Sequence, residues 1–355
     1  MSKKTSDYTF GQGAQINPSN RFFTYTQGDF FDDFDPEEEN TFKKKIIEVF
    51  PKTIINKVPS PDIGMFYSLN PYQGCEHGCT YCYARPTHEY WGYSAGIDFE
   101  RVILVKKNAP DILEQTLRRK SWKVQTISLS GNTDCYQPCE RRYQITRKLL
   151  QVMLKYKHPV SIITKNALIC RDLDILKELA NLNLVSVNVS LTTLKEDLRR
   201  KLEPRTTSCK KKLETIETLS IAGIPVNVMM APIIPAINDD EIFSVAKATS
   251  EKGARSIHCQ IVRLNGATAE VFVDWLKKNY PERANKVMNQ LRDMHGGKTN
   301  DSRFGIRMKG EGNYAENIHR QMNIARKRFF PKQDFPKLRT DIFEIPDESG
   351  QMRLF

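Results

Sequence analysis

Residues 70–83 read Asn70-Pro71-Tyr72-Gln73-Gly74-Cys75-Glu76-His77-Gly78-Cys79-Thr80-Tyr81-Cys82-Tyr83 and hold three of the eight cysteines of the chain. The cysteines are spaced Cys-x3-Cys-x2-Cys, in a stretch that its proline and two glycines predict to be a loop. Thiolates are soft ligands, and a short glycine-containing loop can wrap three of them around one face of an iron–sulfur cube. Because such a cube needs one ligand for each of its four irons, three cysteines leave one iron open, as catalytic metal sites do.

Two simpler interpretations compete with the cluster. The thiols could bind zinc with His77 as the fourth ligand, or they could be ordinary buried cysteines. Zinc loops usually pair with a second, distant Cys-x2–4-Cys, and here Cys135 and Cys139 are the nearest other cysteines. His77 also lies between ligand positions, where we expect its ring to point away from a shared centre. The spacing therefore favours the cluster over zinc.

Composition places the chain among globular proteins. It has 355 residues, of which 39% are hydrophobic, enough for one large domain or two modest ones. No apolar run approaches the roughly 20 residues of a membrane helix, and no apolar stretch follows the basic start Met1–Thr5. We expect a cytoplasmic protein without a membrane partner, in which cysteines are ligands or buried thiols rather than disulfides.

The chain is basic, with a net charge of +12 from 54 basic and 42 acidic residues. Such an excess favours polyanionic partners, chiefly nucleic acid, although a solvated charged surface remains the alternative. The basic residues gather in compact clusters, namely Arg118-Arg119-Lys120, Arg141-Arg142, Arg199-Arg200-Lys201, Lys210-Lys211-Lys212 and Arg326-Lys327-Arg328.

The pattern divides the chain into four parts. Residues 1–62 form an irregular N-terminal arm that includes the acidic stretch Asp29–Glu39, and residues 63–263 form the core. Residues 264–330 form a helical C-terminal cap, with helices expected at 268–279, 281–294 and 315–330. Residues 331–355 are rich in proline and charge and form an extended tail.

Short apolar runs alternate with helix-period segments in the core. We expect strands at 64–69, 126–130, 160–164, 184–190, 226–230 and 256–262, and helices at 111–119, 144–156, 173–182, 211–222 and 240–252. Arg101–Val105 is a further β-type run. Alternation of this kind predicts a parallel sheet in an α/β fold, and six units would close into a partial (β/α)6 parallel barrel. A doubly wound open sheet is the alternative; in either fold the cysteine loop follows the first strand, at the end that carries chemistry.

Several short stretches resemble a known family. The three-cysteine motif with an aromatic residue before the last cysteine resembles that of the radical S-adenosylmethionine (SAM) superfamily. Further short segments of the sequence are similar to those of the spore photoproduct lyase-like (DNA repair photolyase-like) group: Ser60–Ile63, Asn70–Cys75, Gly131–Glu140, Ile163–Lys165, Val189–Thr193, Leu202–Arg205 and Ala231–Pro235. The resemblance covers about residues 60–265 and implies a radical SAM-type barrel.

The resemblance implies two cofactors. Cys75, Cys79 and Cys82 match the ligands of a [4Fe–4S] cluster whose open iron chelates SAM, and one electron then splits SAM into methionine and a 5′-deoxyadenosyl radical. Tyr81 matches the aromatic residue beside the SAM adenine. The superfamily's glycine-glycine-acid motif is absent, and Gly131-Asn132-Thr133-Asp134 occupies its place.

Three further kinds of contact to SAM are expected. Asn132, Thr133 or Asp134 would meet the methionine amino group, because an amine requires neutral or anionic oxygens. Lys165 would pair with the carboxylate and Ser190 with a ribose hydroxyl. The alternative is that these strand-end residues satisfy backbone groups and that Lys165 is a surface charge.

The hydrogen donor of the reaction is not fixed by any motif. In the namesake enzyme the adenosyl radical removes a hydrogen from a methylene-bridged thymine dimer and a cysteine returns one. Cys135 follows the second strand and is a weak candidate for this role, with Tyr136 behind it. Cys170, Cys209 and Cys259 fit better as small hydrophobic residues.

The sequence thus predicts a radical SAM enzyme that acts on damaged or modified DNA. RNA, a peptide or a small molecule is the alternative substrate, and a metal-stabilised nucleic-acid-binding module without turnover is the alternative class. We expect a reductant such as ferredoxin or flavodoxin. The final residues, Gln351-Met352-Arg353-Leu354-Phe355, resemble the pentapeptide by which bacterial repair and replication proteins dock on the sliding clamp.

Overall fold

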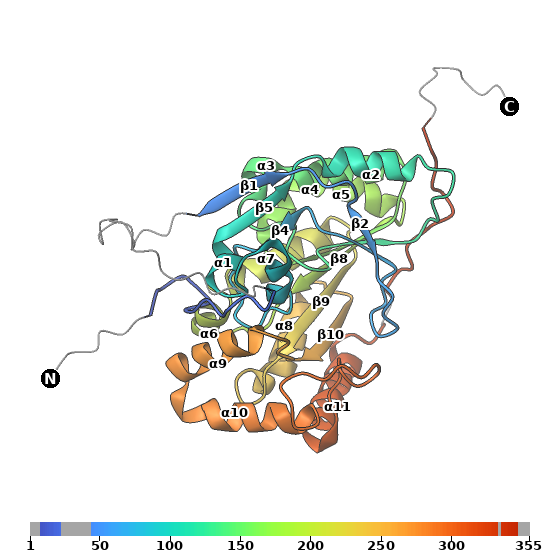
Figure 1. Cartoon of the computed structure of the whole chain (residues 1–355). Coiled ribbons are helices and arrows are strands. Elements are labelled where there is room, and N and C mark those ends of the chain that lie inside the picture. The colour runs from blue at the N-terminus through green and yellow to red at the C-terminus, as the bar shows by residue number, and fades with distance from the viewer. Residues whose placement is uncertain (1–7, 23–43, 333–334, 347–355) are drawn as a thin grey trace, which may run out of the picture.

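A computed structural model describes residues 8–22, 44–332 and 335–346. Its central element is a seven-stranded sheet in the order β10-β9-β8-β7-β6-β3-β2 (Figure 1). The first six of these strands are parallel, and β2 (Ile55–Lys57) pairs antiparallel with β3. The parallel strands are β3 (Tyr67–Leu69), β6 (Ile127–Leu129), β7 (Val160–Thr164), β8 (Val185–Ser190), β9 (Val226–Ile233) and β10 (Ser256–Ile261).

The strand order decides between the two predicted architectures. Each parallel strand pairs with the one before it along the chain, so the order never reverses, whereas a doubly wound sheet requires a reversal. Within the described ranges, β10 and β2 are the two ends of the sheet and do not pair with each other. The partial, open barrel is therefore confirmed, and the doubly wound alternative is wrong.

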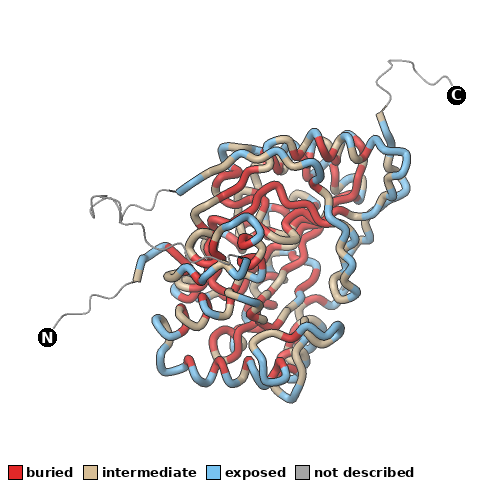
Figure 2. Tube along the Cα trace, viewed as in Figure 1, coloured by how far each residue is buried: buried red, intermediate tan, exposed pale blue. Residues whose placement is uncertain are grey.

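Helices connect the strands where the 3.6-residue period predicts them. They are α2 (Ala109–Leu117), α3 (Glu140–Tyr143), α4 (Ile145–Lys155), α5 (Leu173–Asn181), α6 (Glu196–Leu202), α7 (Cys209–Ile221) and α8 (Ile242–Glu251), with 3-10 turns η2 (Ala167–Asp172) and η3 (Asp239–Glu241). The helix α4 illustrates why the periodicity predicts helices. Its apolar residues Ile145, Leu149 and Met153 repeat every four positions, so they lie on one face, and all three are fully or almost fully buried. Figure 2 shows the buried strands enclosed by these helices.

A second, small sheet has the order β1-β5-β4, with β1 (Lys45–Val49), β5 (Val102–Lys106) and β4 (Tyr72–Gln73). The β-type run at Arg101–Val105 forms β5. The arm at 1–62, expected to be irregular, instead contributes β1, which pairs with β5 far along the chain, and β2, which pairs with the nearby β3. The acidic stretch Asp29–Glu39 and the clamp-like Gln351–Phe355 lie outside the described residues.

The predicted cap helices are α9 (Thr268–Asn279), α10 (Pro281–Met294) and α11 (Gly312–Phe329), drawn together at the bottom of Figure 1. The helix α11 packs against α8 and β10. Trp275 of α9 is fully buried in a cluster with Leu202 of α6 and Tyr81 of the cysteine loop, and its indole nitrogen donates to the Lys201 carbonyl at 2.8 Å. The cap thus packs directly on the cysteine loop.

None of the helices in the described ranges combines the length and the apolar character that crossing a membrane requires.

Trp275→Ala tests the packing of the cap on the cysteine loop. Removing a fully buried indole leaves a cavity and an unpartnered Lys201 carbonyl, so we expect the free energy of unfolding to fall by about 3–5 kcal/mol. The control is Ile221→Ala at a side chain that is 82% exposed, where we expect a change within about 0.5 kcal/mol. Urea unfolding followed by circular dichroism measures both, and equal effects would contradict the assignment.

Candidate active site

The cysteine loop turns sharply after β4 at two glycines. Gly74 and Gly78 have φ angles of +77° and +70°. A Cβ atom at Gly74 would lie 2.4 Å from the Val102 carbonyl oxygen, and one at Gly78 would lie 2.7 Å from a Glu100 oxygen. Both positions therefore require glycine, because a side chain is strained in this backbone conformation and meets atoms that are already close.

Glu100, in α1 (Ile97–Arg101), holds the loop from one side. Its carboxylate is fully buried and pairs with Arg85 and Arg205, each at 2.6 Å. It also accepts from the backbone N–H groups of Gly13 and Ala14 at 3.1 and 2.6 Å. A buried charge is tolerated when it is fully paired and hydrogen-bonded, so this carboxylate joins the N-terminal arm, the cysteine loop and residue 205 into one unit.

Glu203 holds the loop from the other side. Its fully buried carboxylate pairs with Lys212 at 2.9 Å and Lys165 at 3.1 Å, and it accepts from the Tyr81 hydroxyl and from Thr192. Burial alone would raise the pKa of Glu203, but the two lysines outweigh it and hold the pKa well below its usual range. The carboxylate is therefore ionised, and it fixes the phenol ring that lies between the last two cysteines of the motif.

A cavity of about 580 Å³ lies at the carboxyl ends of the parallel strands. Its walls include the three cysteines, Tyr81, Tyr83, Asn132, Asp134, Lys165, Ser190, His258 and Arg263. Burial raises the pKa of all three thiols, and a thiol that binds a metal loses its proton outright. Two buried thiols and the half-buried thiol of Cys82, all lining a cavity of this size, fit a cluster with room for a small-molecule ligand beside it.

The zinc alternative finds no support in the geometry. Within the described ranges, no three His, Cys, Asp or Glu side chains lie close enough together to hold a single metal ion. His77 is buried and is hydrogen-bonded on both ring nitrogens, to Asp134 at 3.3 Å and to Asn166 at 3.1 Å. Each cysteine ligand of a cubic cluster binds a different iron, so three thiols that do not converge on one ion remain compatible with a cluster.

The three residues expected at the methionine amino group differ in their placement. Asn132 lines the cavity, and no donor to its side-chain oxygen occurs among the described residues. Asp134 also lines it, but accepts from Thr164 and from the Lys165 and Tyr136 backbone N–H groups. Thr133 is buried, donates to the Tyr72 carbonyl at 2.6 Å and is not a lining residue. Asn132 is best placed to accept from an amine.

Lys165 and Ser190 are brought together at the ends of β7 and β8. The Lys165 ammonium donates to the Ser190 hydroxyl at 2.6 Å and lies 5.6 Å from the Tyr81 ring centroid. Burial alone would lower the pKa of Lys165, but the neighbouring Glu203 outweighs it and raises the pKa. The lysine is therefore a charged part of the cavity wall and not the surface charge of the alternative interpretation.

The candidate hydrogen donor lies elsewhere. Cys135 is fully buried in the main hydrophobic cluster, and Tyr136 donates to Asp172 at 3.1 Å. Neither residue lines the cavity, whose cysteines within the described ranges are the three of the loop. Tyr83, which sequence reasoning did not single out, does line it; this side chain is 46% exposed and donates to the Gly131 carbonyl at 2.6 Å.

Glu203→Gln tests the buried carboxylate. The change leaves Lys165 and Lys212 without their anion, and breaking a buried pair on one side costs about 3–5 kcal/mol of stability at pH 7. Because the folded-state pKa is depressed, the wild-type advantage is present above the unfolded pKa of about 4.3 and shrinks as the pH falls below it.

Urea midpoints of the apoprotein at pH 7 and at pH 4 check both statements. The control is Glu214→Gln, which removes an exposed partner of Lys211 and should leave the midpoint nearly unchanged. A Glu203→Gln protein as stable as the wild type at pH 7 would show that the carboxylate does not hold the loop.

Comparison with known proteins places this geometry in a family. Residues 69–248 match the radical SAM superfamily. An uncharacterized protein of Mycobacterium tuberculosis (strain ATCC 25618 / H37Rv) is 37% identical over 238 residues, which span 66% of this chain and 70% of the relative. An uncharacterized protein of Methanocaldococcus jannaschii is 29% identical over 248 residues, 70% of this chain and 88% of the relative.

Solved structures show the same fold. Spore photoproduct lyase complexed with dinucleoside spore photoproduct has a TM-score of 0.60 at 15% sequence identity. A mutant of that lyase with bound AdoMet and dinucleoside spore photoproduct has a TM-score of 0.59 at 16% sequence identity. Each match covers 82% of both chains. The predicted family is confirmed, and the alternative of a binding module without turnover is set aside. The chain therefore belongs to the radical SAM superfamily, and it is an enzyme that uses a [4Fe–4S] cluster and S-adenosylmethionine.

Proposed function

We propose that the enzyme holds its cluster on Cys75, Cys79 and Cys82 and acts on damaged or modified DNA. The observation that carries the DNA assignment is a basic groove beside the cavity, described below. When bound, the cluster and SAM supply a one-electron reductive cleavage that yields an organic radical. This electron comes from outside the chain, from a reductant of the ferredoxin or flavodoxin class.

Different residues of the cavity contact different parts of SAM. The side-chain oxygen of Asn132 accepts from the methionine amino group, and the charged Lys165 pairs with the carboxylate. Ser190 lies 2.6 Å from the Lys165 ammonium and is available to a ribose hydroxyl once the lysine turns to the carboxylate. Tyr81, fixed by Glu203, lies beside the adenine. Rigid placement of this kind avoids the entropic cost of ordering the site when SAM binds.

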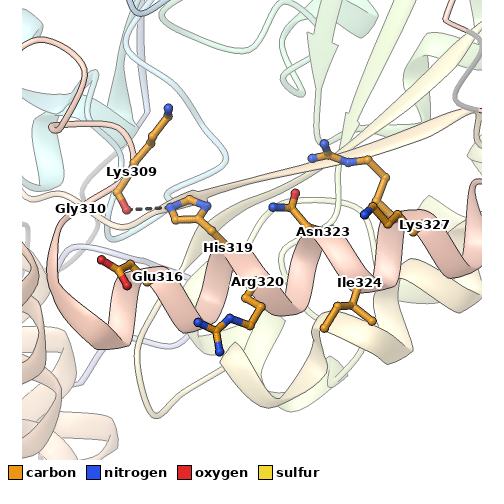
Figure 3. A pocket seen from close by; sticks show the side chains of 9 residues that line it. Lys309, Gly310, Glu316, His319, Arg320, Asn323, Ile324 and Lys327 are labelled. Carbon is orange, nitrogen blue, oxygen red and sulfur yellow. Dashed lines mark hydrogen bonds between the residues drawn. The ribbon is translucent and has the colours of Figure 1, made fainter.

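The basic groove has a volume of about 850 Å³ and runs along α11 (Figure 3). Five of its nine lining residues are basic, one is acidic and three are uncharged: Lys309, His319, Arg320, Arg326, Lys327, Glu316, Gly310, Asn323 and Ile324. His319 contacts the Lys309 carbonyl at 2.8 Å, which ties the start of the groove to the helix. A row of cations along an open groove suits a phosphate backbone.

The groove and the cavity adjoin each other. Met308 lines the cavity and Lys309, the next residue, lines the groove. Arg326 donates to the Ile257 carbonyl in β10, whose later residues His258 and Gln260 line the cavity. A polyanion in the groove would therefore lie next to the cavity mouth. The solved lyase of the same fold carries a dinucleoside spore photoproduct, which supports DNA over a peptide as the substrate of this enzyme.

Cys79→Ala tests the cluster ligands. Loss of one thiolate should abolish the cluster, because each protein thiolate holds a separate iron. We expect about four irons per chain and reductive SAM cleavage in the anaerobically reconstituted wild type, and neither in the variant. The control is Cys139→Ala, whose thiol is buried but does not line the cavity and should leave the iron content unchanged. A colourless wild-type protein that binds zinc would refute the assignment.

Arg320→Gln combined with Lys327→Gln tests the DNA groove. The slope of log affinity against log salt for a DNA duplex should become shallower by about 0.9 for each phosphate that the protein no longer neutralises, or about 1.8 in total. Filter binding or fluorescence anisotropy between 50 and 200 mM salt measures the slope. The control, Lys210→Gln with Lys211→Gln, removes the same charge from α7, outside both cavities, and should leave the slope unchanged. Equal slopes for the wild type and the groove variant would reject the groove as the surface that binds DNA.

A further inference from the structure

The charged side chains that line the cavity have partners among the described residues, with one exception. Four formally charged side chains face it: Asp62, Asp134, Lys165 and Arg263. Asp62 pairs with Arg307 at 2.7 Å, Lys165 pairs with Glu203 at 3.1 Å, and Asp134 contacts His77 at 3.3 Å. Arg263 has no hydrogen bond or ion pair within the part of the chain that the structure describes.

Arg263 lies just after β10, two residues beyond its last residue, Ile261. Its Nε is buried without a hydrogen-bond partner. The carboxylate of Asp62, which acts electrostatically on Arg263, already accepts from Arg307 and from the Gly305 backbone N–H, each at 2.7 Å. The neighbouring Tyr83 hydroxyl donates to the Gly131 carbonyl. A guanidinium has five donors and stays charged, and a buried donor without a partner requires an explanation, of which a missing ligand is the simplest.

We propose that Arg263 binds a phosphodiester group of the substrate inside the cavity. The planar guanidinium matches a phosphate with two parallel hydrogen bonds, and a half-buried one whose Nε has no partner among the described residues is prepared for that contact. This inference rests on the proposed function and deepens it: the groove on α11 binds the backbone outside, and Arg263 binds the one phosphodiester that enters the cavity.

The position of Arg263 separates it from the residues proposed to hold SAM. Lys165 follows β7, and two strands lie between β7 and β10. Neighbouring strands are about 4.8 Å apart, so the two strand ends from which these side chains extend are separated by roughly 14 Å along the sheet. The cavity walls also include the apolar side chains of Ile63, Met65 and Met308. A half-buried cation in a cavity with apolar walls suits a nucleotide unit taken out of its stack, with bases on the apolar walls and phosphate on the guanidinium.

The test compares two ligands that differ only in the charge of the linkage. The probes are the dinucleotide TpT and its neutral methylphosphonate analogue, titrated calorimetrically into the reconstituted holoenzyme with SAM present. The wild type should bind TpT roughly ten to a hundred times more tightly than the analogue, which is the range for a hydrogen bond to a charged group. Arg263→Gln should bind both equally, and Arg263→Lys should restore part of the preference.

The matched control is Arg255→Gln. Arg255 is exposed just before β10 begins, and its loss removes the same charge near the same strand outside the cavity. This variant should keep the wild-type preference for TpT. All variants should keep the wild-type SAM affinity and thermal unfolding midpoint, which shows that the change is confined to the linkage.

Three results would overturn the inference. They are a wild type that binds the two probes equally or binds neither at millimolar concentration, an Arg263→Gln variant that keeps the preference, and an Arg263→Gln variant whose SAM affinity falls by the same factor as its TpT affinity. None of these results depends on how duplex binding in the groove varies with salt. The inference about Arg263 can therefore be wrong while the proposed DNA function still holds. Equal salt slopes for the wild type and the groove variant, together with an intact preference for TpT, would reject the groove as the DNA-binding surface. The assignment of Arg263 would then still hold.

Discussion

Two buried carboxylates decide the shape of the site, because each is stable only if the chain surrounds it with cations. Glu100 requires Arg85 and Arg205, and Glu203 requires Lys165 and Lys212. Removing one partner of such a pair leaves an uncompensated charge in the interior, at a cost of several kcal/mol. The four cations come from the 3-10 helix Arg85–Trp91 just after the cysteine loop, from residue 205, from the end of β7 and from α7, so satisfying the two charges fixes these segments against one another.

This arrangement explains how the loop is organised by the chain itself. The Arg205 guanidinium bonds both Glu100 and the Glu76 carbonyl, and its backbone N–H donates to the His77 carbonyl at 3.2 Å. The residue that precedes the second carboxylate, Leu202, accepts from the Thr80 N–H at 3.1 Å. The backbone between Cys75 and Cys82 is therefore held at several points by protein groups. A site whose ligands are positioned in advance loses less entropy when the cofactors bind.

The sequence predicted what local patterns and short spacings determine. The six parallel strands followed from their apolar runs, and the cluster motif from three cysteines within eight positions. What it missed depends on contacts between distant residues. Glu203 occurs in a matched motif but looks like any glutamate until Lys165 and Lys212 enclose it, and Arg263 stands out only because its buried Nε has no hydrogen-bond partner among the described residues. The sequence could not separate Thr133 from Asn132 as a contact of the methionine amino group, because sequence alone does not show which way neighbouring side chains point.

The open side of the barrel also depends on distant contacts. Arg307 bonds Asp62 and Ser60 on the β2–β3 side of the sheet, and the next residue, Met308, accepts from Gln260 in β10. The segment around residue 308 therefore bridges the two edges of the sheet that do not pair. It lies outside the region of family resemblance, about residues 60–265, and outside the match at 69–248. The residues proposed to hold the cofactors thus belong to the shared core, whereas the cavity wall that we propose faces the substrate includes a cap segment outside that core. Substrate choice can change there without disturbing the two buried carboxylates on which the cofactor site depends.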